Sequence, residues 1–300
     1  MGENMLSDKA QQFIRTVGNT PLIKISDRLY GKLETANPTG SIKDRMISYV
    51  VKQAMTQGKI KPHTLLVEAT SGNTGIALSA LGAAMNNPVQ IIMPCNMSKE
   101  RKQMMRTFGA DIVEVAASDF DAAIQKRNEI LLDTDDSWSP LQFENKDNIL
   151  CHKHETGPEI YRQMPPGCKW SAFISGSGTG GTIMGIREFI KSKDLETKII
   201  MVRPAETSTS HGIQGIGDGE DFLAITSLFD EIYDIKTEDA KERARRFALE
   251  NGLLVGISAG ANILAAERWI ERNKPAGDVV TILCDRGERY LSSVWGAPNV

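Results

Sequence analysis

The stretch TLLVEATSGNTGIALSALGAAMNNPVQIIM, residues 64–93, decides the fold. Thr64–Val67 is a short apolar run typical of a buried strand, and Val89–Met93 is a second run of the same kind. Between them, Asn73–Met85 consists of small and apolar residues and predicts a helix. A strand, a helix and a second strand in this order form a right-handed βαβ unit, which requires two parallel strands.

The same alternation continues in both directions along the chain. The predicted strands outside the first unit are Asp111–Val115, Ala172–Ile174, Lys198–Val202 and Val279–Leu283. The predicted helices are a stretch from Ile42 to Met55, one from Ser98 to Gly109, Phe120–Leu132, one that starts at Thr182, Glu238–Glu250 and Ala261–Arg272. We therefore expect an α/β protein with two open, mostly parallel sheets flanked by helices. In such folds ligands bind beyond the carboxyl ends of the strands, so we expect the active site in the cleft between two domains.

The composition excludes several classes of protein. The chain has 300 residues, of which 41% are hydrophobic and 24% are charged, so a disordered, collagen-like or coiled-coil chain is excluded. The 35 basic and 38 acidic side chains give a net charge of −3, which argues against nucleic acid as a partner. No apolar stretch reaches the roughly 20 residues that span a bilayer, and the N-terminus lacks the apolar core of a signal peptide. The four cysteines form no C-x-x-C pair, and we expect a cytoplasmic protein.

A first loop, Asn37–Arg45, precedes a predicted helix. Ser41 as N-cap and Asp44 three residues later would complete a capping box. Capping does not explain Lys43, because a lysine in the first helical turn faces the positive end of the helix dipole. The dipole lowers the pKa of such an amine, and an unprotonated lysine amine is a nucleophile that forms Schiff bases.

A second loop, Glu68–Gly75, lies between a predicted strand and a predicted helix. Its polar side chains are Thr70, Ser71, Asn73 and Thr74. Four polar residues interleaved with two glycines exceed what capping one helix requires. Because a helix N-terminus binds anions readily, we expect a site for a carboxylate or a phosphate here.

A third loop, Ser175–Thr182, again connects a strand to a helix. Its glycines allow the backbone to approach an anion closely, so a ligand that carries a phosphate is expected. Residues 176–181 also match the G-x-G-x-x-G pattern of dinucleotide-binding proteins. The acidic residue that such proteins need about 20 residues further on could be Asp194 or Glu196, which keeps a nicotinamide-dependent dehydrogenase open as an alternative. The segment His152–Glu155 offers no third ligand at a suitable spacing, so no metal site is expected.

As a set, these loops resemble the cysteine synthase and cystathionine β-synthase family of pyridoxal-phosphate enzymes, which have fold type II. The matching segments occur in the same order as in the family and extend over nearly the whole chain. The residues within them are most similar to the B-type branch of the family. The matching segments are Gly18-Asn-Thr-Pro-Leu22, Lys32-Leu-Glu34, Asn37-Pro-Thr-Gly-Ser-Ile-Lys-Asp-Arg45, Thr70-Ser-Gly-Asn-Thr-Gly75, Met93-Pro94, Gly157-Pro-Glu-Ile160, Gly178-Thr-Gly-Gly-Thr182, Gly215-Ile-Gly217, Gly256-Ile-Ser-Ala-Gly260 and Asp285-Arg-Gly-Glu-Arg-Tyr-Leu-Ser292.

The resemblance implies pyridoxal 5'-phosphate as cofactor, with Lys43 holding it as an internal aldimine and then acting as general base. Asn73 would bind the oxygen of the ring hydroxyl, and Ser258 would face the pyridine nitrogen, although a serine just before a helix is also a common cap. A neutral hydroxyl at that nitrogen makes the ring a weaker electron sink, which favours β-elimination and β-replacement over transamination. The phosphate would be bound by Gly178, Thr179, Gly180, Gly181 and Thr182.

The resemblance also implies the substrates. Thr70, Ser71, Thr74 and Gln142 would hold the substrate carboxylate, and Gly215 would line the cleft near the substrate amine. The implied reaction makes L-cysteine from O-acetyl-L-serine and sulfide, or another small thiol, through an aminoacrylate intermediate in a homodimer. Cysteine desulfhydration and cystathionine formation remain alternatives. The acidic residues Asp218, Glu220 and Asp221 lie near the implied site without an assigned role.

The family's two-domain architecture implies where the chain divides. We expect residues 37–145 to form a smaller, mobile α/β domain. Residues 1–36 and 146–300 would form a larger α/β domain that carries the phosphate loop. Binding of the substrate carboxylate is expected to close the smaller domain and exclude water.

Overall fold

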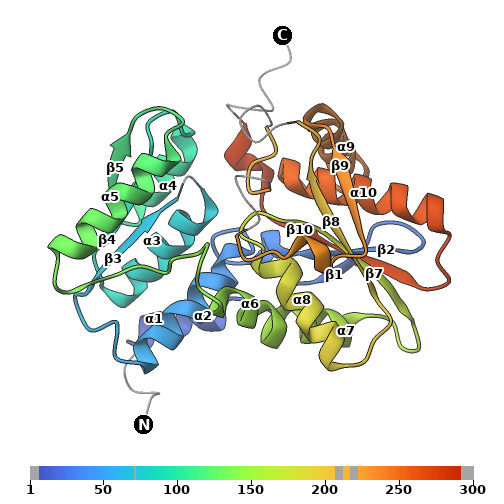
Figure 1. Ribbon diagram of the computed structural model, residues 1–300, viewed down its shortest axis with the longest axis horizontal. Helices are drawn as coiled ribbons and strands as arrows, with labels where there is room; N and C mark the ends of the chain where they lie inside the picture. The colour runs from blue at the N-terminus through green and yellow to red at the C-terminus, as the bar shows by residue number, and fades with distance from the viewer. Residues whose placement is uncertain (1–6, 71, 207–211, 217–221, 292–300) are drawn as a thin grey trace. The chain divides into compact units, whose positions relative to one another are not determined.

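The computed structural model describes residues 7–70, 72–206, 212–216 and 222–291. The chain divides into two compact units, which are described separately (Figure 1). The first unit comprises residues 1–17, 37–141 and 289–300, and the second comprises residues 18–36 and 142–288. Within the described ranges, no helix combines the length and the apolar character needed to cross a lipid bilayer.

The first unit contains a parallel sheet of four strands. Its strands are β3 (Leu65–Ala69), β4 (Val89–Pro94), β5 (Asp111–Val115) and β6 (Ser137–Trp138), in the spatial order β5-β4-β3-β6. Every pairing in this sheet is parallel. Its helices are α1 (Asp8–Arg15), α2 (Lys43–Thr56), α3 (Asn73–Met85), α4 (Lys99–Thr107) and α5 (Phe120–Asp133).

Helices cover both faces of this sheet, because successive side chains of a strand point to opposite faces. Leu66 and Ile91 pack into a core with residues of α2 and α3. Val67 and Ile92, which alternate with them, pack into a separate core with Ala123 of α5. β3 and β4 are therefore buried on both faces, as expected of central strands in a parallel sheet.

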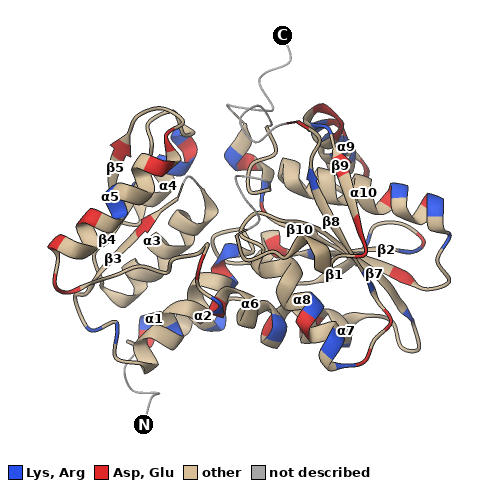
Figure 2. Cartoon of the chain, viewed as in Figure 1, with Lys and Arg blue, Asp and Glu red and all other residues tan. Residues whose placement is uncertain are grey.

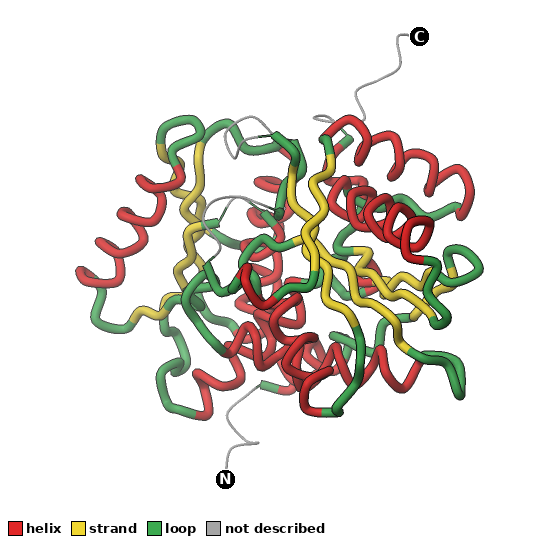
Figure 3. Tube along the Cα trace, turned by 45° about the vertical axis from the view of Figure 1, so that its right-hand side comes forward, coloured by secondary structure: helices red, strands yellow, loops and turns green. Residues whose placement is uncertain are grey.

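The second unit contains a sheet of six strands, drawn in yellow in Figure 3. Its strands are β1 (Leu22–Lys24), β2 (Leu29–Leu33), β7 (Trp170–Gly176), β8 (Lys198–Pro204), β9 (Glu231–Ile235) and β10 (Asp278–Leu283), in the spatial order β1-β2-β10-β7-β8-β9. Only the edge pair β1–β2 is antiparallel among these strands.

Helices also lie on both sides of this second sheet (Figure 1). They are α6 (Asp147–Cys151), a π-helix η2 (His152–Thr156), α7 (Gly157–Gln163), α8 (Gly181–Ser192), α9 (Thr237–Asn251) and α10 (Ile257–Asn273). Short 3₁₀ turns complete the unit: η1 (Glu34–Ala36), η3 (Thr226–Leu228) and η4 (Gly287–Tyr290), the last of which runs on into the first unit. The prediction of two mostly parallel sheets flanked by helices is confirmed.

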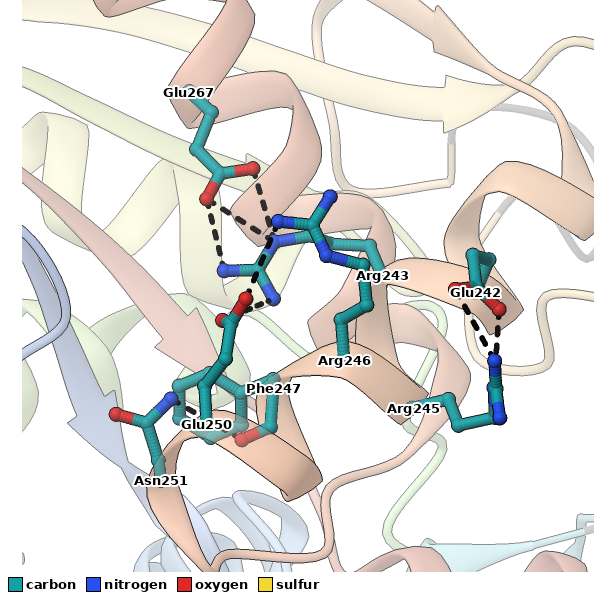
Figure 4. A network of polar contacts seen from close by, with 8 residues as sticks. All are labelled: Glu242, Arg243, Arg245, Arg246, Phe247, Glu250, Asn251 and Glu267. Carbon is teal, nitrogen blue, oxygen red and sulfur yellow. Dashed lines mark hydrogen bonds and ion pairs between the residues drawn. The ribbon is translucent and has the colours of Figure 1, made fainter.

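α9 and α10 are bound tightly to each other, although α9 carries many charged side chains (Figure 2). A Cβ atom on Gly260 of α10 would lie 2.1 Å from the carbonyl oxygen of Ala240 in α9, so only glycine permits this approach. The nearly buried Arg243 of α9 donates from Nη2 to Glu267 Oε1 of α10 at 2.8 Å and pairs with Glu250 at 3.2 Å (Figure 4). Close packing at Gly260 therefore holds the first turn of α10, which carries Ser258, and the buried guanidinium holds the same helix further along, at Glu267.

Candidate active site

Lys43 is the first residue of α2, so the prediction of a lysine in the first helical turn is confirmed. The side chain is half-buried. The predicted capping box is wrong. Ile42 is the N-cap, and Ser41 Oγ accepts a long hydrogen bond from the Lys43 amide at 3.3 Å. The Asp44 carboxylate instead accepts from the amide of Thr39 at 2.8 Å and from the Thr39 hydroxyl. Because Ile42 already has helical dihedral angles, the carboxylate closes the turn before the helix rather than capping it.

The second predicted loop connects β3 to α3. Thr70 and Thr74 are both buried, while Ser71 lies outside the described residues. The N-cap of α3 is Gly72, which has no side chain with which to cap the amides of the first turn. The N-terminus of α3 carries the positive end of the helix dipole, which suits an anion, so the predicted carboxylate site is chemically reasonable. Gly75 has a packing role, because a Cβ atom there would lie 2.8 Å from Met105 Cε.

Asn73, the first residue of α3, has a partner that the sequence did not identify. Arg289 in η4 donates from Nη1 to Asn73 Oδ1 and from Nη2 to the carbonyl oxygen of Thr39 at 2.6 Å. One nearly buried guanidinium thus joins the start of α3 to the turn that precedes Lys43. The motif that contains Arg289 was visible in the sequence, but nothing in its spacing indicated which loops the arginine would contact.

The third loop, between β7 and α8, is built so that its glycines are required. A Cβ atom on Gly178 would lie 2.3 Å from Gly215 O, and one on Gly181 would lie 1.9 Å from Asn148 Oδ1. Gly180 has a φ of +87°, a conformation that favours glycine. The Thr179 hydroxyl accepts from Asn148 Nδ2 at 3.0 Å and more weakly from the Gly181 amide at 3.3 Å, which fixes the threonine in the loop.

Thr182 contacts a histidine that the sequence reasoning had considered only as a metal ligand. His152 is buried, its Nε2 lies 3.3 Å from the Thr182 hydroxyl, and its Nδ1 lies 2.9 Å from the Thr156 hydroxyl. His152 opens the π-helix η2, a form that occurs often at functional sites. Within the described ranges, no group of three or more possible ligands could hold a metal ion. The contacts of His152 connect Thr182, at the end of the loop, to Thr156 in η2.

Ser258 is buried and is the second residue of α10. The expectation that it could be a cap before a helix from Ala261 is wrong, because α10 begins at Ile257 and its N-cap is Gly256. The first four residues of α10, residues 257–260, are small or apolar and gave no helix signal in the sequence. Ser258 is thus not needed to cap the helix, which leaves its hydroxyl for another role.

The remaining predicted residues lie in the second unit. Gln142 is buried, and its main-chain carbonyl oxygen accepts from Asn148 Nδ2 at 2.9 Å. Gly215 has a φ of +84° and supplies the carbonyl oxygen that lies against Gly178. The acidic residues of the following segment, Asp218, Glu220 and Asp221, lie outside the described residues.

Comparison with known proteins identifies the family. The model of the family described as pyridoxal-phosphate dependent enzyme matches residues 14–285. The chain belongs to this family. The enzyme is 38% identical to cysteine synthase B of Salmonella typhimurium over 296 residues, which cover 93% of this chain and 94% of that protein.

Solved structures agree with this family. A hydrogen sulfide-producing enzyme from Fusobacterium nucleatum is similar with a TM-score of 0.87 and 34% identity, over 93% of this chain and 99% of that chain. An O-acetylserine dependent cystathionine beta-synthase from Helicobacter pylori is similar with a TM-score of 0.88 and 32% identity, over 95% of this chain and 98% of that chain. The enzyme has the fold of these proteins, and pyridoxal phosphate is its cofactor.

The described residues fit this cofactor in each unit taken by itself. The loop that ends at Gly181 offers backbone amides and the positive end of the α8 dipole, and such a helix start is suited to a phosphate without a cationic side chain. Added Cβ atoms would overlap the walls of this loop at Gly178 and Gly181, so its close-packed geometry is maintained by the absence of side chains. In the first unit, Lys43 carries an amine, the group that forms a Schiff base with an aldehyde.

The nicotinamide-dependent alternative is wrong. Asp194 and Glu196 precede β8, which runs parallel to β7. They therefore lie at the edge where β8 begins, whereas the glycine loop follows the opposite, carboxyl end of β7. A ribose-binding carboxylate would have to lie at the carboxyl end. Glu196 instead pairs with Lys169 at 2.9 Å, and this hydrogen bond lowers the pKa of its carboxyl group.

Proposed function

We propose that this enzyme makes L-cysteine from O-acetyl-L-serine and sulfide by β-replacement. The observation that carries the proposal is the similarity to cysteine synthase B over 93% of the chain. The geometry of each unit is consistent with that chemistry, from the lysine at the start of α2 to the glycine loop before α8.

Bound pyridoxal phosphate supplies the electron sink that makes the α-proton of an amino acid acidic and allows a β-substituent to leave. We assign Lys43 Nζ to the covalent bond with the aldehyde carbon of the cofactor. Lys43 Nζ would then be the base that removes the proton from the α-carbon of the substrate, with acetate leaving from the β-carbon. Sulfide then adds to the β-carbon, and Lys43 Nζ returns the proton to the α-carbon, which completes cysteine.

The other proposed residues bind and orient. Residues 178–182 bind the phosphate, and Asn73 donates to the oxygen of the ring hydroxyl. Thr70, Thr74 and Gln142 hold the substrate carboxylate, together with Ser71, and Gly215 lines the substrate site. Ser258 offers the pyridine nitrogen a buried neutral hydroxyl. Because a hydroxyl does not hold a proton on that nitrogen as a carboxylate does, the site favours loss of a β-substituent over transamination.

A second candidate function is the release of sulfide from cysteine, since a hydrogen sulfide-producing enzyme is similar over 93% of the chain. The H. pylori enzyme similarly supports cystathionine formation, with a thiol amino acid as second substrate. Both reactions use the same residues up to the loss of the β-substituent. They differ in the leaving group and in the nucleophile that follows.

We also propose a homodimer that works in the cytoplasm. All four cysteines, Cys95, Cys151, Cys168 and Cys284, are free thiols, which fits a reducing compartment. The homodimer rests on the family resemblance, and sedimentation equilibrium of the purified protein tests it directly. A monomer at all concentrations would contradict it.

The decisive experiment is a product screen with O-acetylserine, O-phosphoserine, serine and cysteine as first substrates, with and without sulfide. We expect O-acetylserine plus sulfide to give the fastest turnover and cysteine as product. Lys43→Ala should lack the covalent cofactor bond and all α-proton exchange, while Lys52→Ala, on the same helix, serves as the matched lysine control. Faster turnover of cysteine alone would favour sulfide release instead, and retained exchange in Lys43→Ala would refute the assignment.

A further inference from the structure

Arg289 occupies a position that no step of the proposed reaction uses. It lies in η4 and is nearly buried, and its guanidinium donates to Asn73 Oδ1 and to the carbonyl oxygen of Thr39. All three residues belong to the first unit. The arginine comes from the far end of the chain, more than 200 positions from Asn73, so the contact is made only in the folded protein.

The chemistry of arginine determines which way the Asn73 amide points. A guanidinium has only hydrogen-bond donors, so the atom of Asn73 that faces it must be the carbonyl oxygen. The amide NH₂ group of Asn73 is consequently directed away from Arg289. Only that orientation lets Asn73 donate a hydrogen bond to an oxygen of a ligand.

The same contact strengthens the donor. A cation that binds the carbonyl oxygen of an amide withdraws electrons from its nitrogen, and hydrogen bonds in series reinforce one another. The N–H bonds of Asn73 then interact more strongly with an anionic oxygen than with a protonated one. A phenol-type oxygen bound by this amide is thereby stabilised in its ionised form.

We propose that Arg289 is a positioning residue that orients and polarises the Asn73 amide toward the ring oxygen of pyridoxal phosphate. This rests on the proposed role of Asn73 in binding that oxygen. The second bond of Arg289 serves the same purpose, because the Thr39 carbonyl belongs to the turn that the Asp44 carboxylate closes before Lys43. One guanidinium thus sets the position of Asn73 relative to the helix start that carries the proposed nucleophile.

The test uses two properties of the bound cofactor that do not depend on turnover. The first is the dissociation constant of pyridoxal phosphate, measured by titrating apoprotein. The second is the ratio of the cofactor's absorption bands at one pH, which reports whether the ring oxygen is ionised. In Arg289→Met we expect pyridoxal phosphate to bind about tenfold more weakly, because one charge-assisted hydrogen bond is lost. We also expect the band of the ionised ring oxygen to contribute a smaller share of the absorption. Arg289→Lys, which keeps the charge, should lie between this variant and the parent.

Two further variants separate positioning from general stability. Arg243→Met removes an arginine that is equally buried but is paired with Glu267 in the second unit. It should lower the melting temperature and leave the band ratio at the parent value. In an Asn73→Ala background, Arg289→Met should change the band ratio no further, because its effect passes through the amide.

Several results would overturn the proposal. It fails if Arg289→Met has the parent band ratio, whatever happens to affinity or stability, or if it changes the ratio equally in the Asn73→Ala background. If Arg289→Met does not fold, Arg289→Lys is judged by the same criterion. The proposed function fails separately: borohydride reduction of the parent holoenzyme would then label a residue other than Lys43, or none, before any Arg289 variant is compared.

Discussion

Gly181→Ala is the substitution whose effect follows most directly from the structure. The added Cβ atom would lie 1.9 Å from Asn148 Oδ1, whereas ordinary van der Waals contact begins at 3.4 Å. Oδ1 would therefore have to retreat by about 1.5 Å, the difference between these distances. The amide cannot retreat that far without losing the bonds from its Nδ2 to Gln142 O, at 2.9 Å, and to Thr179 Oγ1, at 3.0 Å.

The magnitude follows from these contacts. Two net hydrogen bonds contribute about 1 kcal/mol each, and the better helix propensity of alanine at the start of α8 offsets up to about 1 kcal/mol. We expect a loss of about 1–2 kcal/mol in the free energy of unfolding. Because Thr179 would no longer be held, we expect about tenfold weaker binding of pyridoxal phosphate, which corresponds to roughly 1.4 kcal/mol.

A double-mutant cycle provides the assay. The midpoint of urea unfolding of apoprotein and the dissociation constant of the cofactor are measured for Gly181→Ala, Asn148→Ala and the double variant. Asn148→Ala removes the atoms that the new Cβ would meet, so the second substitution should cost little in that background. Strictly additive effects, or a Gly181→Ala protein that is as stable as the parent, would refute the steric reasoning.

Three further predictions concern the rest of the molecule. Glu159→Gln removes the carboxylate that lies 2.9 Å from the fully buried Lys32 ammonium, so we expect a loss of roughly 3 kcal/mol in urea unfolding; the same loss in a Lys32→Met background would contradict this. Burial, and then a hydrogen bond to a neighbouring aspartate, raise the pKa of the Cys168 thiol, so iodoacetamide at about pH 8.5 should label it more slowly than exposed Cys95, as judged by mass spectrometry. Because the folded thiol has the higher pKa, its neutral form stabilises the fold at pH values below the pKa of the unfolded thiol, and this stabilisation is lost as the pH rises through the raised pKa of the folded thiol. Equal labelling rates would contradict the inference. Gly260→Ala should lower the melting temperature by overpacking α10 against α9, with a loss of about 1–3 kcal/mol, and an unchanged melting temperature would count against the close packing.

The elements that the sequence predicted well are those whose burial is decided within the element. α3 begins and ends at the predicted residues Asn73 and Met85, because its small apolar residues are buried on nearly all sides. β5 likewise has its predicted bounds, Asp111–Val115. The strands β1, β2, β6 and β9 were not predicted. Of these, β1 and β6 have only three and two residues and owe their conformation to the strands beside them.

The residue types of the candidate site are visible in the sequence, but the contacts that support them are not. Lys43 and the glycine loop stand out locally, since the first is unfavourable in an ordinary helix start and the second has an unusual glycine content. The contacts of Arg289 with Asn73 and of His152 with Thr182 join segments that are distant in sequence. No local pattern specifies such pairs, because they follow from how whole elements pack.

The side chain of Asn262 connects β7 and β10 beyond the point where the hydrogen bonds between the two strands end. The last paired residues of β7 and β10 are Ile174 and Thr281. Beyond them, Asn262 Oδ1 accepts from the Gly176 amide at 2.8 Å and Asn262 Nδ2 donates to Ile282 O at 2.9 Å. The loops that leave these two strands therefore depart from a common anchor on α10. A ligand that immobilises the loop after β7 should also slow amide hydrogen exchange in the loop after β10, although it touches only the first.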